Sequence, residues 1–168
     1  MSTAIPPRPR QVGIAPRQVG TKRRFAIVAS QFNGEYVQGL VDHATRELHG
    51  LSASAQIDLH QVPGAFEIPV VAREVARKKG ADAIVALGVI LAGKTEHAEH
   101  LARSVSDSLQ RIAIEDGIPV IHAVLSLKNE TQARERCLED TMNRGTEAAR
   151  AAVQMANLMA DLRERHHG

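Results

Sequence analysis

The run from Ala83 to Leu91 constrains the fold more than any other segment of the chain. It is apolar and rich in β-branched residues, which is typical of a strand buried on both faces of a sheet. Gly93 interrupts the run, and helix-forming residues follow it. The end of a central strand beside the start of a helix is where α/β proteins bind anions. We therefore expect a phosphate site in the segment Gly93-Lys94-Thr95-Glu96-His97.

Strand-like and helix-like segments alternate along the rest of the chain. This alternation predicts βαβ units, a parallel sheet and helices on both of its faces. We predict a three-layer α/β/α sandwich with a central four-stranded parallel sheet. The expected strands are 25–30, 55–62, 83–91 and 119–127, and the expected helices are 36–48, 68–79, 98–116, 131–138 and 145–164. The first helix should end near Gly50, and Gly80 and Gly117 should close the second and third.

Composition narrows the possible classes of function. Residues 1–24 contain six basic residues and no acidic one, whereas the rest of the chain has 15 basic and 19 acidic residues. Nucleic-acid binders usually carry their basic patch on the folded body, so we expect no nucleic-acid partner. No apolar run reaches the ~20 residues of a membrane span, and no secretory signal opens the chain. With Cys137 as the single cysteine, we expect a cytoplasmic protein without a membrane partner.

The first residues differ in composition from the rest. Four of the seven prolines lie within residues 1–16, and Pro-Arg-Gln-Val-Gly occurs twice, at 9–13 and 16–20. We predict a flexible basic N-terminal arm over residues 1–21 and one folded domain over residues 22–168. Residues 17–20 are expected to be able to pair with a sheet as an added strand.

The loops after the four predicted strands should meet at the carboxyl edge of the sheet, where open α/β sheets bind ligands. These loops are residues 31–34, 63–67, 93–97 and 128–130. Phe32 can stack on a planar ring, although a place in the core is the ordinary alternative. His97 suits acid–base catalysis because its pKa is normally near neutrality, and the alternative is a solvated residue at a helix start.

Two further classes of site are disfavoured by spacing. The segment around Gly93 lacks the second glycine of a P-loop, so we expect a small phosphate group rather than a nucleoside triphosphate. His97 and His100 are three residues apart, but no third ligand has a recognisable metal spacing. We therefore expect no metal site.

Taken together, the motifs resemble the 6,7-dimethyl-8-ribityllumazine synthase family. The resemblance covers roughly residues 22–163 and is carried by Phe32-Asn33, Gly64-Ala65-Phe66-Glu67-Ile68-Pro69, Ala86-Leu87-Gly88-Val89-Ile90, Gly93 to His97, Gln132-Ala133 with Arg136, and Asn143-Arg144-Gly145. It implies a flavodoxin-like fold and a transferase of riboflavin biosynthesis. Such an enzyme condenses 5-amino-6-(D-ribitylamino)uracil with 3,4-dihydroxy-2-butanone 4-phosphate, releases phosphate and water, and uses no metal or organic cofactor.

The resemblance also implies roles for individual residues. His97 is expected to be the catalytic proton shuttle. The pyrimidine and its ribityl chain are expected at Phe32, Asn33, Gly64, Ala65, Phe66, Glu67, Ile90, Leu91 and His122, and the phosphate at Lys94, Thr95, Arg136 and Arg144. Four positions depart from the common pattern: His122 replaces a frequent Phe, Arg144 replaces a Lys, Ala92 replaces a basic residue and Ala98 replaces a Phe.

The resemblance further implies a homopentamer whose active sites are shared between subunits. Further assembly should depend on residues 138–142, where Glu139-Asp140 replaces the Gly- and Lys-rich turn of shell-forming members. We favour pentamers or pairs of pentamers over a closed shell, with a functional link to riboflavin synthase. The alternative function is a weakly active flavin- or lumazine-binding assembly protein. A flavodoxin-like electron carrier is disfavoured because residues 31–34 are not a hydroxyl- and glycine-rich phosphate loop.

Overall fold

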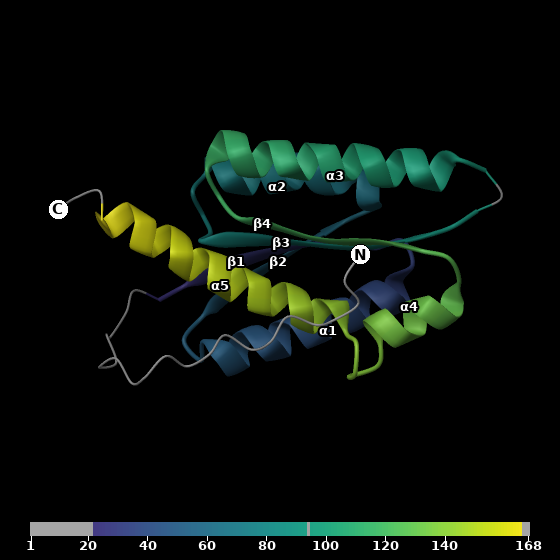
Figure 1. Ribbon diagram of the computed structural model, residues 1–168, viewed down its shortest axis with the longest axis horizontal. Helices are drawn as coiled ribbons and strands as arrows, with labels where there is room; N and C mark the ends of the chain where they lie inside the picture. Colours follow the sequence, from purple (N-terminus) through teal and green to yellow (C-terminus); the bar gives the residue numbers. More distant parts are fainter. Residues whose placement is uncertain (1–21, 94, 166–168) are drawn as a thin grey trace.

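A computed structural model describes residues 22–93 and 95–165. Four parallel strands form one sheet in the order β2-β1-β3-β4, with helices on both faces (Figure 1). The elements are β1 (Arg24–Ser30), α1 (Gly34–Leu51), β2 (Gln56–Val62), the 3-10 turn η1 (Ala65–Glu67), α2 (Ile68–Arg77), β3 (Ala83–Leu91), α3 (His97–Asp116), β4 (Val120–Leu127), α4 (Glu130–Cys137) and α5 (Arg144–Arg165). This strand order is flavodoxin-like, so the predicted fold class is confirmed. The predicted arm, including residues 17–20, lies outside the described residues.

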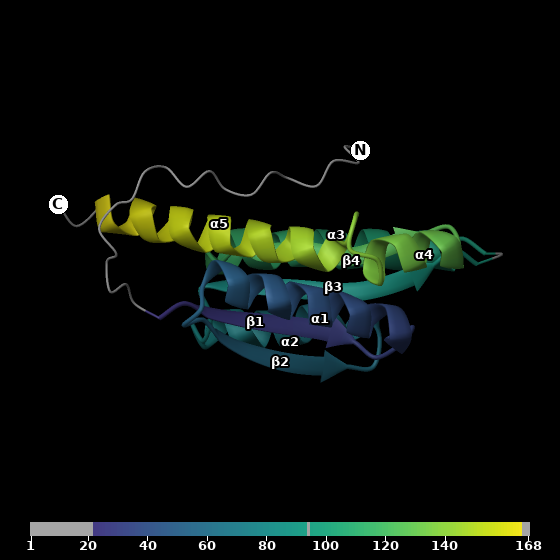
Figure 2. The same cartoon turned by 90° about the horizontal axis from the view of Figure 1, so that it is seen from below.

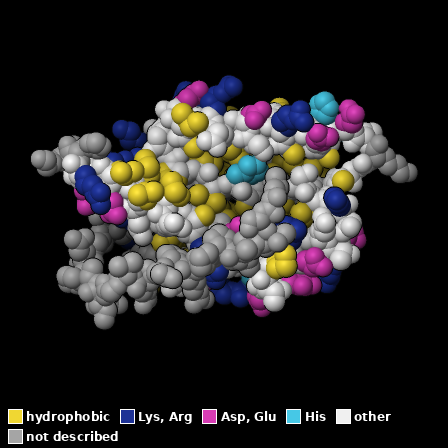
Figure 3. Space-filling view, in the orientation of Figure 1, with side chains coloured by type: hydrophobic (Ala, Val, Ile, Leu, Met, Phe, Trp, Pro, Cys, Tyr) yellow, Lys and Arg dark blue, Asp and Glu magenta, His cyan; other side chains and the backbone are white. Residues whose placement is uncertain are grey.

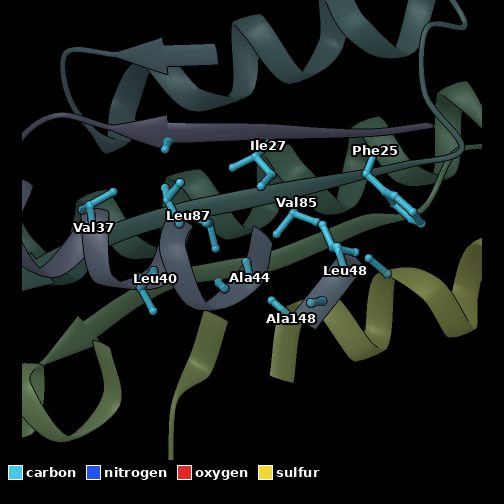
Figure 4. Packing of buried hydrophobic residues seen from close by; sticks show 14 of the residues in the cluster. Phe25, Ile27, Val37, Leu40, Ala44, Leu48, Val85, Leu87 and Ala148 are labelled. Atoms are coloured by element: carbon cyan, nitrogen blue, oxygen red, sulfur yellow. The ribbon is translucent and has the colours of Figure 1, made fainter. Parts of the chain in front are cut away.

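The two faces of the sheet have separate cores. Helices α2 and α3 cover one face, and α1, α4 and α5 cover the other (Figures 1 and 2). Because side chains alternate along a strand, Phe25 and Ile27 of β1 pack with α1 and α5, while Val28 packs with α2 and α3. Figure 4 shows the first core, in which Val85 of β3 lies beside Leu48 of α1. Aliphatic side chains and alanine fill most of both cores.

Strand β3 is the most buried strand, as its apolar sequence predicted. Its first eight residues are all buried, because strands flank it on both sides and helices cover both faces. Strand β4 is an edge strand within the described residues, and several of its side chains stay partly exposed. A groove of the candidate functional site lies along this edge of β4.

Helices α4 and α5 are held against α1 at two glycines. A Cβ atom on Gly145 would collide with the backbone oxygen of Leu40, and one on Gly39 would collide with that of Cys137. Asn143 is fully buried, and its Oδ1 accepts the backbone N–H of Gly145 at 2.9 Å. This bond satisfies a backbone donor at the start of α5. It therefore helps to fix the position of Arg144, the first residue of the helix.

Most predicted boundaries agree with the structure within two residues. Helix α3 starts at His97 and ends before Gly117, whose φ of 63° is left-handed as expected for a C-cap. The prediction that Gly80 closes α2 is wrong: the helix ends at Arg77, and Lys79 adopts the left-handed φ of 52°. Among the described helices, none combines the length and hydrophobicity of a transmembrane segment.

Candidate functional site

The loops after β1 and β2 are joined by backbone hydrogen bonds. The N–H of Gln31 donates to the Val62 carbonyl at 2.8 Å, and the N–H of Phe32 donates to the Pro63 carbonyl at 3.1 Å. The Phe32 side chain is 71% exposed and that of Phe66 is 67% exposed. Phe32 therefore does not pack in the core, and two apolar rings lie open to solvent at the carboxyl edge of the sheet.

Asn33 fixes the first of these loops to the central strand. Its Nδ2 donates to the Val89 carbonyl at 2.8 Å. Its φ of 56° is left-handed, a conformation that asparagine tolerates better than most residues. One of the two Nδ2 hydrogens is thus used within the protein, and the side-chain oxygen and the second N–H are the polar groups that Asn33 can offer to a ligand.

Glu67 closes the turn at the start of η1. Its Oε2 accepts the N–H of Gly64 at 3.0 Å, and its own N–H donates to the Gly64 carbonyl at 3.2 Å. Both polar groups of the Gly64 backbone are therefore occupied. The N–H groups of Ala65 and Phe66 begin the turn, where a helical turn leaves its first donors without internal partners.

The loop after β3 borders a small depression of about 460 Å³, which Gly93, Thr95 and Ser126 help to line. Ile90 is buried and Leu91 is partly buried at the end of the strand, while Thr95 is exposed. His97 is an exposed residue in the first turn of α3, at the positive end of the helix dipole. This loop contains Lys94, which lies outside the described residues.

A larger groove of about 790 Å³ runs along the open edge of β4, between α3 on one side and α4 and α5 on the other. Figure 3 looks onto this edge and shows hydrophobic side chains and a histidine exposed between the helices. The groove contains three of the predicted site residues, namely His122, Arg136 and Arg144. It also has two acidic side chains, Glu99 and Glu147.

The cations of the groove differ in their partners. Arg144 is paired with Glu147 on the next turn of α5, and Arg103 is paired with Glu99 at 3.0 Å on α3. Arg136 has a buried Nε without a hydrogen-bond partner in the described part of the chain. An unpaired buried donor on a cation is unfavourable unless an acceptor arrives, so Arg136 is the side chain of the groove best suited to bind an anion.

His122 projects from β4 into this groove. Its Nε2 lies 2.7 Å from Ser106 Oγ, and its Nδ1 accepts the N–H of Val124 at 3.1 Å. The surrounding protein desolvates the ring and lowers the pKa of His122 below its ordinary value, since burial disfavours the charged form.

The predicted site residues form two separate groups within one chain. His122 pairs with Ala86, whereas Asn33 is bonded to Val89, which pairs with Leu125. The loop after β1 is therefore about 10 Å from His122 along the strand direction, and it is also two strand positions away across the sheet. The loops with Phe32, Glu67 and His97 lie beyond the strand ends. One aromatic ring cannot stack on both groups, because stacked rings are within ~7 Å of each other.

Sequence reasoning missed four residues of the groove, namely Glu99, Arg103, Ser106 and Glu147. A signal for three of them was present. Glu99, Ala102, Arg103 and Ser106 are spaced i, i+3, i+4, i+7, which puts them on one face of a helix. That face became significant only when the structure placed it beside the open edge of β4.

Residues 22–93 and 95–165 hold neither a cluster of metal ligands nor a reactive thiol. No three His, Cys, Asp or Glu side chains of this part of the chain are grouped so that they could hold a metal ion. Cys137 is buried, and desolvation raises the pKa of its thiol to about 12. The thiol is therefore protonated at neutral pH and unsuited to nucleophilic chemistry.

Comparisons with known proteins were made on the whole chain. The profile of a family described as 6,7-dimethyl-8-ribityllumazine synthase matches residues 22–160. A relative of that name from Leptothrix cholodnii is 38% identical over 151 residues, which are 89% of this chain and 96% of the relative. A de novo designed Rossmann fold protein of known structure aligns with 67% of this chain and 91% of its own, at 14% identity and a TM-score of 0.38, and this weak likeness carries no argument.

Proposed function

Because the chain belongs to the 6,7-dimethyl-8-ribityllumazine synthase family, we propose that its two groups of site residues are the two halves of one active site. The reaction is the condensation of 5-amino-6-(D-ribitylamino)uracil with 3,4-dihydroxy-2-butanone 4-phosphate, which gives 6,7-dimethyl-8-ribityllumazine, phosphate and water in riboflavin biosynthesis. The family match over residues 22–160 carries this conclusion. Neither comparison supports the alternative of an assembly protein with little catalysis.

The reaction is tested by mixing the purified chain with both substrates and following the absorbance of the lumazine. We expect product to form well above the rate of the same mixture without protein. A rate equal to that background would contradict the assigned reaction.

In the proposed site, the loops at the carboxyl edge bind the pyrimidine substrate. The exposed ring of Phe32 stacks on the pyrimidine. The polar groups of the pyrimidine and its ribityl chain bind to five parts of these loops: the Asn33 side-chain amide, the N–H groups of Ala65 and Phe66, the Glu67 carboxylate, and the backbone at Ile90 and Leu91. Imine formation, phosphate elimination and ring closure each need a proton to move. We assign these transfers to His97, which is exposed beside this edge.

The phosphate of the second substrate lies, in this proposal, between the loop after β3 and the groove. Thr95 and the start of α3 offer a hydroxyl group and a favourable helix dipole, with Lys94 beside them in sequence. Arg136 adds a cation of the groove whose buried Nε has no hydrogen-bond partner among the described residues. Arg144 is held by Glu147, so it contributes charge to the phosphate site less directly than Arg136 does.

We propose that these halves come from neighbouring subunits. The separation of His122 from the loop after β1, about 10 Å along the strands and two strand positions across the sheet, argues against one chain closing both halves around a single pyrimidine. A head-to-tail ring can bring the groove of one subunit to the loops of the next, and it closes without free ends. The pentamer implied by the family is our proposal for that ring, and the cytoplasm is its proposed location.

Arg136→Ala is expected to raise the KM for the butanone phosphate by about 10- to 100-fold. Loss of a charged hydrogen-bonding partner of a phosphate typically costs ~1.5–3 kcal/mol. The KM for the pyrimidine should change much less. Initial rates measured while each substrate is varied separately give the two values.

The matched control is Arg134→Ala, which removes a cation from an exposed position of the same helix, two residues away. It should leave both KM values near those of the unchanged protein. The assignment of Arg136 to the phosphate would be refuted if Arg136→Ala raised the KM values of both substrates equally. It would also be refuted if Arg134→Ala raised the KM for the butanone phosphate as much as Arg136→Ala does.

A further inference from the structure

The hydrogen bonds around His122 determine which nitrogen of its ring carries a proton. The backbone N–H of Val124 can only donate, so Nδ1, at 3.1 Å, must accept and cannot itself be protonated. A neutral imidazole with an unprotonated Nδ1 carries its proton on Nε2. That N–H points to Ser106 Oγ at 2.7 Å.

Ser106 completes the arrangement because its own proton has another acceptor. The hydroxyl donates to the carbonyl of Ala102 at 2.8 Å, one turn earlier in α3. Its oxygen is then free to accept the Nε2–H of His122. Every donor in the chain from Val124 through His122 and Ser106 to Ala102 thus meets one acceptor, and a second proton on the ring would set Nδ1–H against the Val124 N–H.

The charges that face His122 also favour the neutral ring. Helix α3 presents Glu99 and Arg103, α4 presents Arg136, and α5 presents Arg144 and Glu147. Glu99 and Arg103 form an ion pair within α3, and Arg144 and Glu147 form one within α5. Arg136 adds a positive charge, and it has no ion pair with a described lining residue. Desolvation also lowers the pKa of His122.

We propose that Ser106 is a positioning residue that holds His122 as a neutral plate of fixed orientation, so that the ring face and not a ring nitrogen meets the pyrimidine substrate. This inference rests on the proposed function. It explains how a histidine can occupy the position of a stacking ring without adding a charge or a competing acid–base group. Both nitrogens are engaged by the protein, and the face of the ring is what remains for a ligand.

The first test is a double-mutant cycle read by pyrimidine affinity, measured by calorimetry with 5-amino-6-(D-ribitylamino)uracil alone. Ser106→Ala should weaken binding by about 3- to 10-fold, as expected for the loss of one orienting hydrogen bond. In a His122→Phe background the same change should have no effect, because a phenyl ring makes no bond to Ser106. An equal loss in both backgrounds would show that Ser106 acts on α3 and not through His122.

The second test reads the ring directly. Nitrogen NMR of the imidazole should show a bare Nδ1 and a protonated Nε2 from pH 8 to below ~6.5, the ordinary pKa of histidine. Ser106→Ala should mix the two neutral tautomers, because Nε2–H loses its acceptor and the ring is no longer held in one orientation. A ring that is charged at neutral pH, or a spectrum that Ser106→Ala leaves unchanged, would overturn the inference.

The two proposals can fail separately. Pyrimidine binding with the predicted cycle but without lumazine formation would contradict the proposed reaction alone. Lumazine formation with full pyrimidine affinity in Ser106→Ala would contradict the role of Ser106 alone. A protein that neither binds the pyrimidine nor forms the lumazine would overturn both.

Discussion

Replacing His97 with alanine is expected to slow turnover by about 100-fold or less while leaving affinity for the pyrimidine nearly unchanged. One proton-transfer group typically contributes a factor of this order. The variant keeps the loops that we propose bind and align the two substrates, and such alignment alone lowers a bimolecular barrier. His97 is exposed at the start of α3, so its removal leaves the buried core intact.

The comparison needs single-turnover rates together with pyrimidine binding measured in the absence of the second substrate. His100→Ala is the matched control, because His100 lies one turn further along α3 and is paired with Glu96 at 3.5 Å. It should turn over at nearly the unchanged rate. If pyrimidine affinity falls as far as the rate in His97→Ala, His97 binds the substrate and does not shuttle protons.

The central part of the fold could be predicted because the apolar sequence of β3 agrees with the buried position that the strand takes in the sheet. The apolar run of β3 reads as a buried strand, and the structure places it between β1 and β4 with helices on both faces. Helix α3 ends at Gly117, where glycine adopts the left-handed conformation that closes a helix. The end of α2 shows the limit of this reasoning, since Lys79 takes the left-handed conformation although Gly80 is next to it.

The carboxyl-edge residues of the candidate site were also visible in the sequence, because each follows directly on a strand. The groove could not be predicted from the sequence, because its position depends on which strand is at the edge of the sheet. Ser106 is nine residues from His97 on the same helix, and its i, i+3, i+4, i+7 spacing with Glu99, Ala102 and Arg103 shows only that these residues share a helix face. Its contact with His122 joins a helix face to an edge strand, which only the strand order β2-β1-β3-β4 brings together.

The separation of the carboxyl-edge loops from the groove along β4 leads to the largest expected effect, a recovery of activity when two impaired variants are mixed. His97→Ala and Arg136→Ala, each severely impaired alone at low butanone phosphate, should regain activity when the two proteins are unfolded together and refolded as one mixture. In a mixed ring, some sites receive their loops from an Arg136→Ala subunit and their groove from a neighbouring His97→Ala subunit. These sites contain both His97 and Arg136.

The expected recovery follows from random assembly. With equal amounts of both variants, half of the loop sets and half of the grooves are intact, so roughly a quarter of the sites in a head-to-tail ring are complete. Activity should therefore rise from a few per cent or less to roughly a quarter of that of refolded unchanged protein. Each variant refolded by itself is the control and should gain nothing. If the mixture is no more active than the average of its parts, each chain builds its own complete site, and the groove along β4 must then serve a ligand other than the pyrimidine held by Phe32.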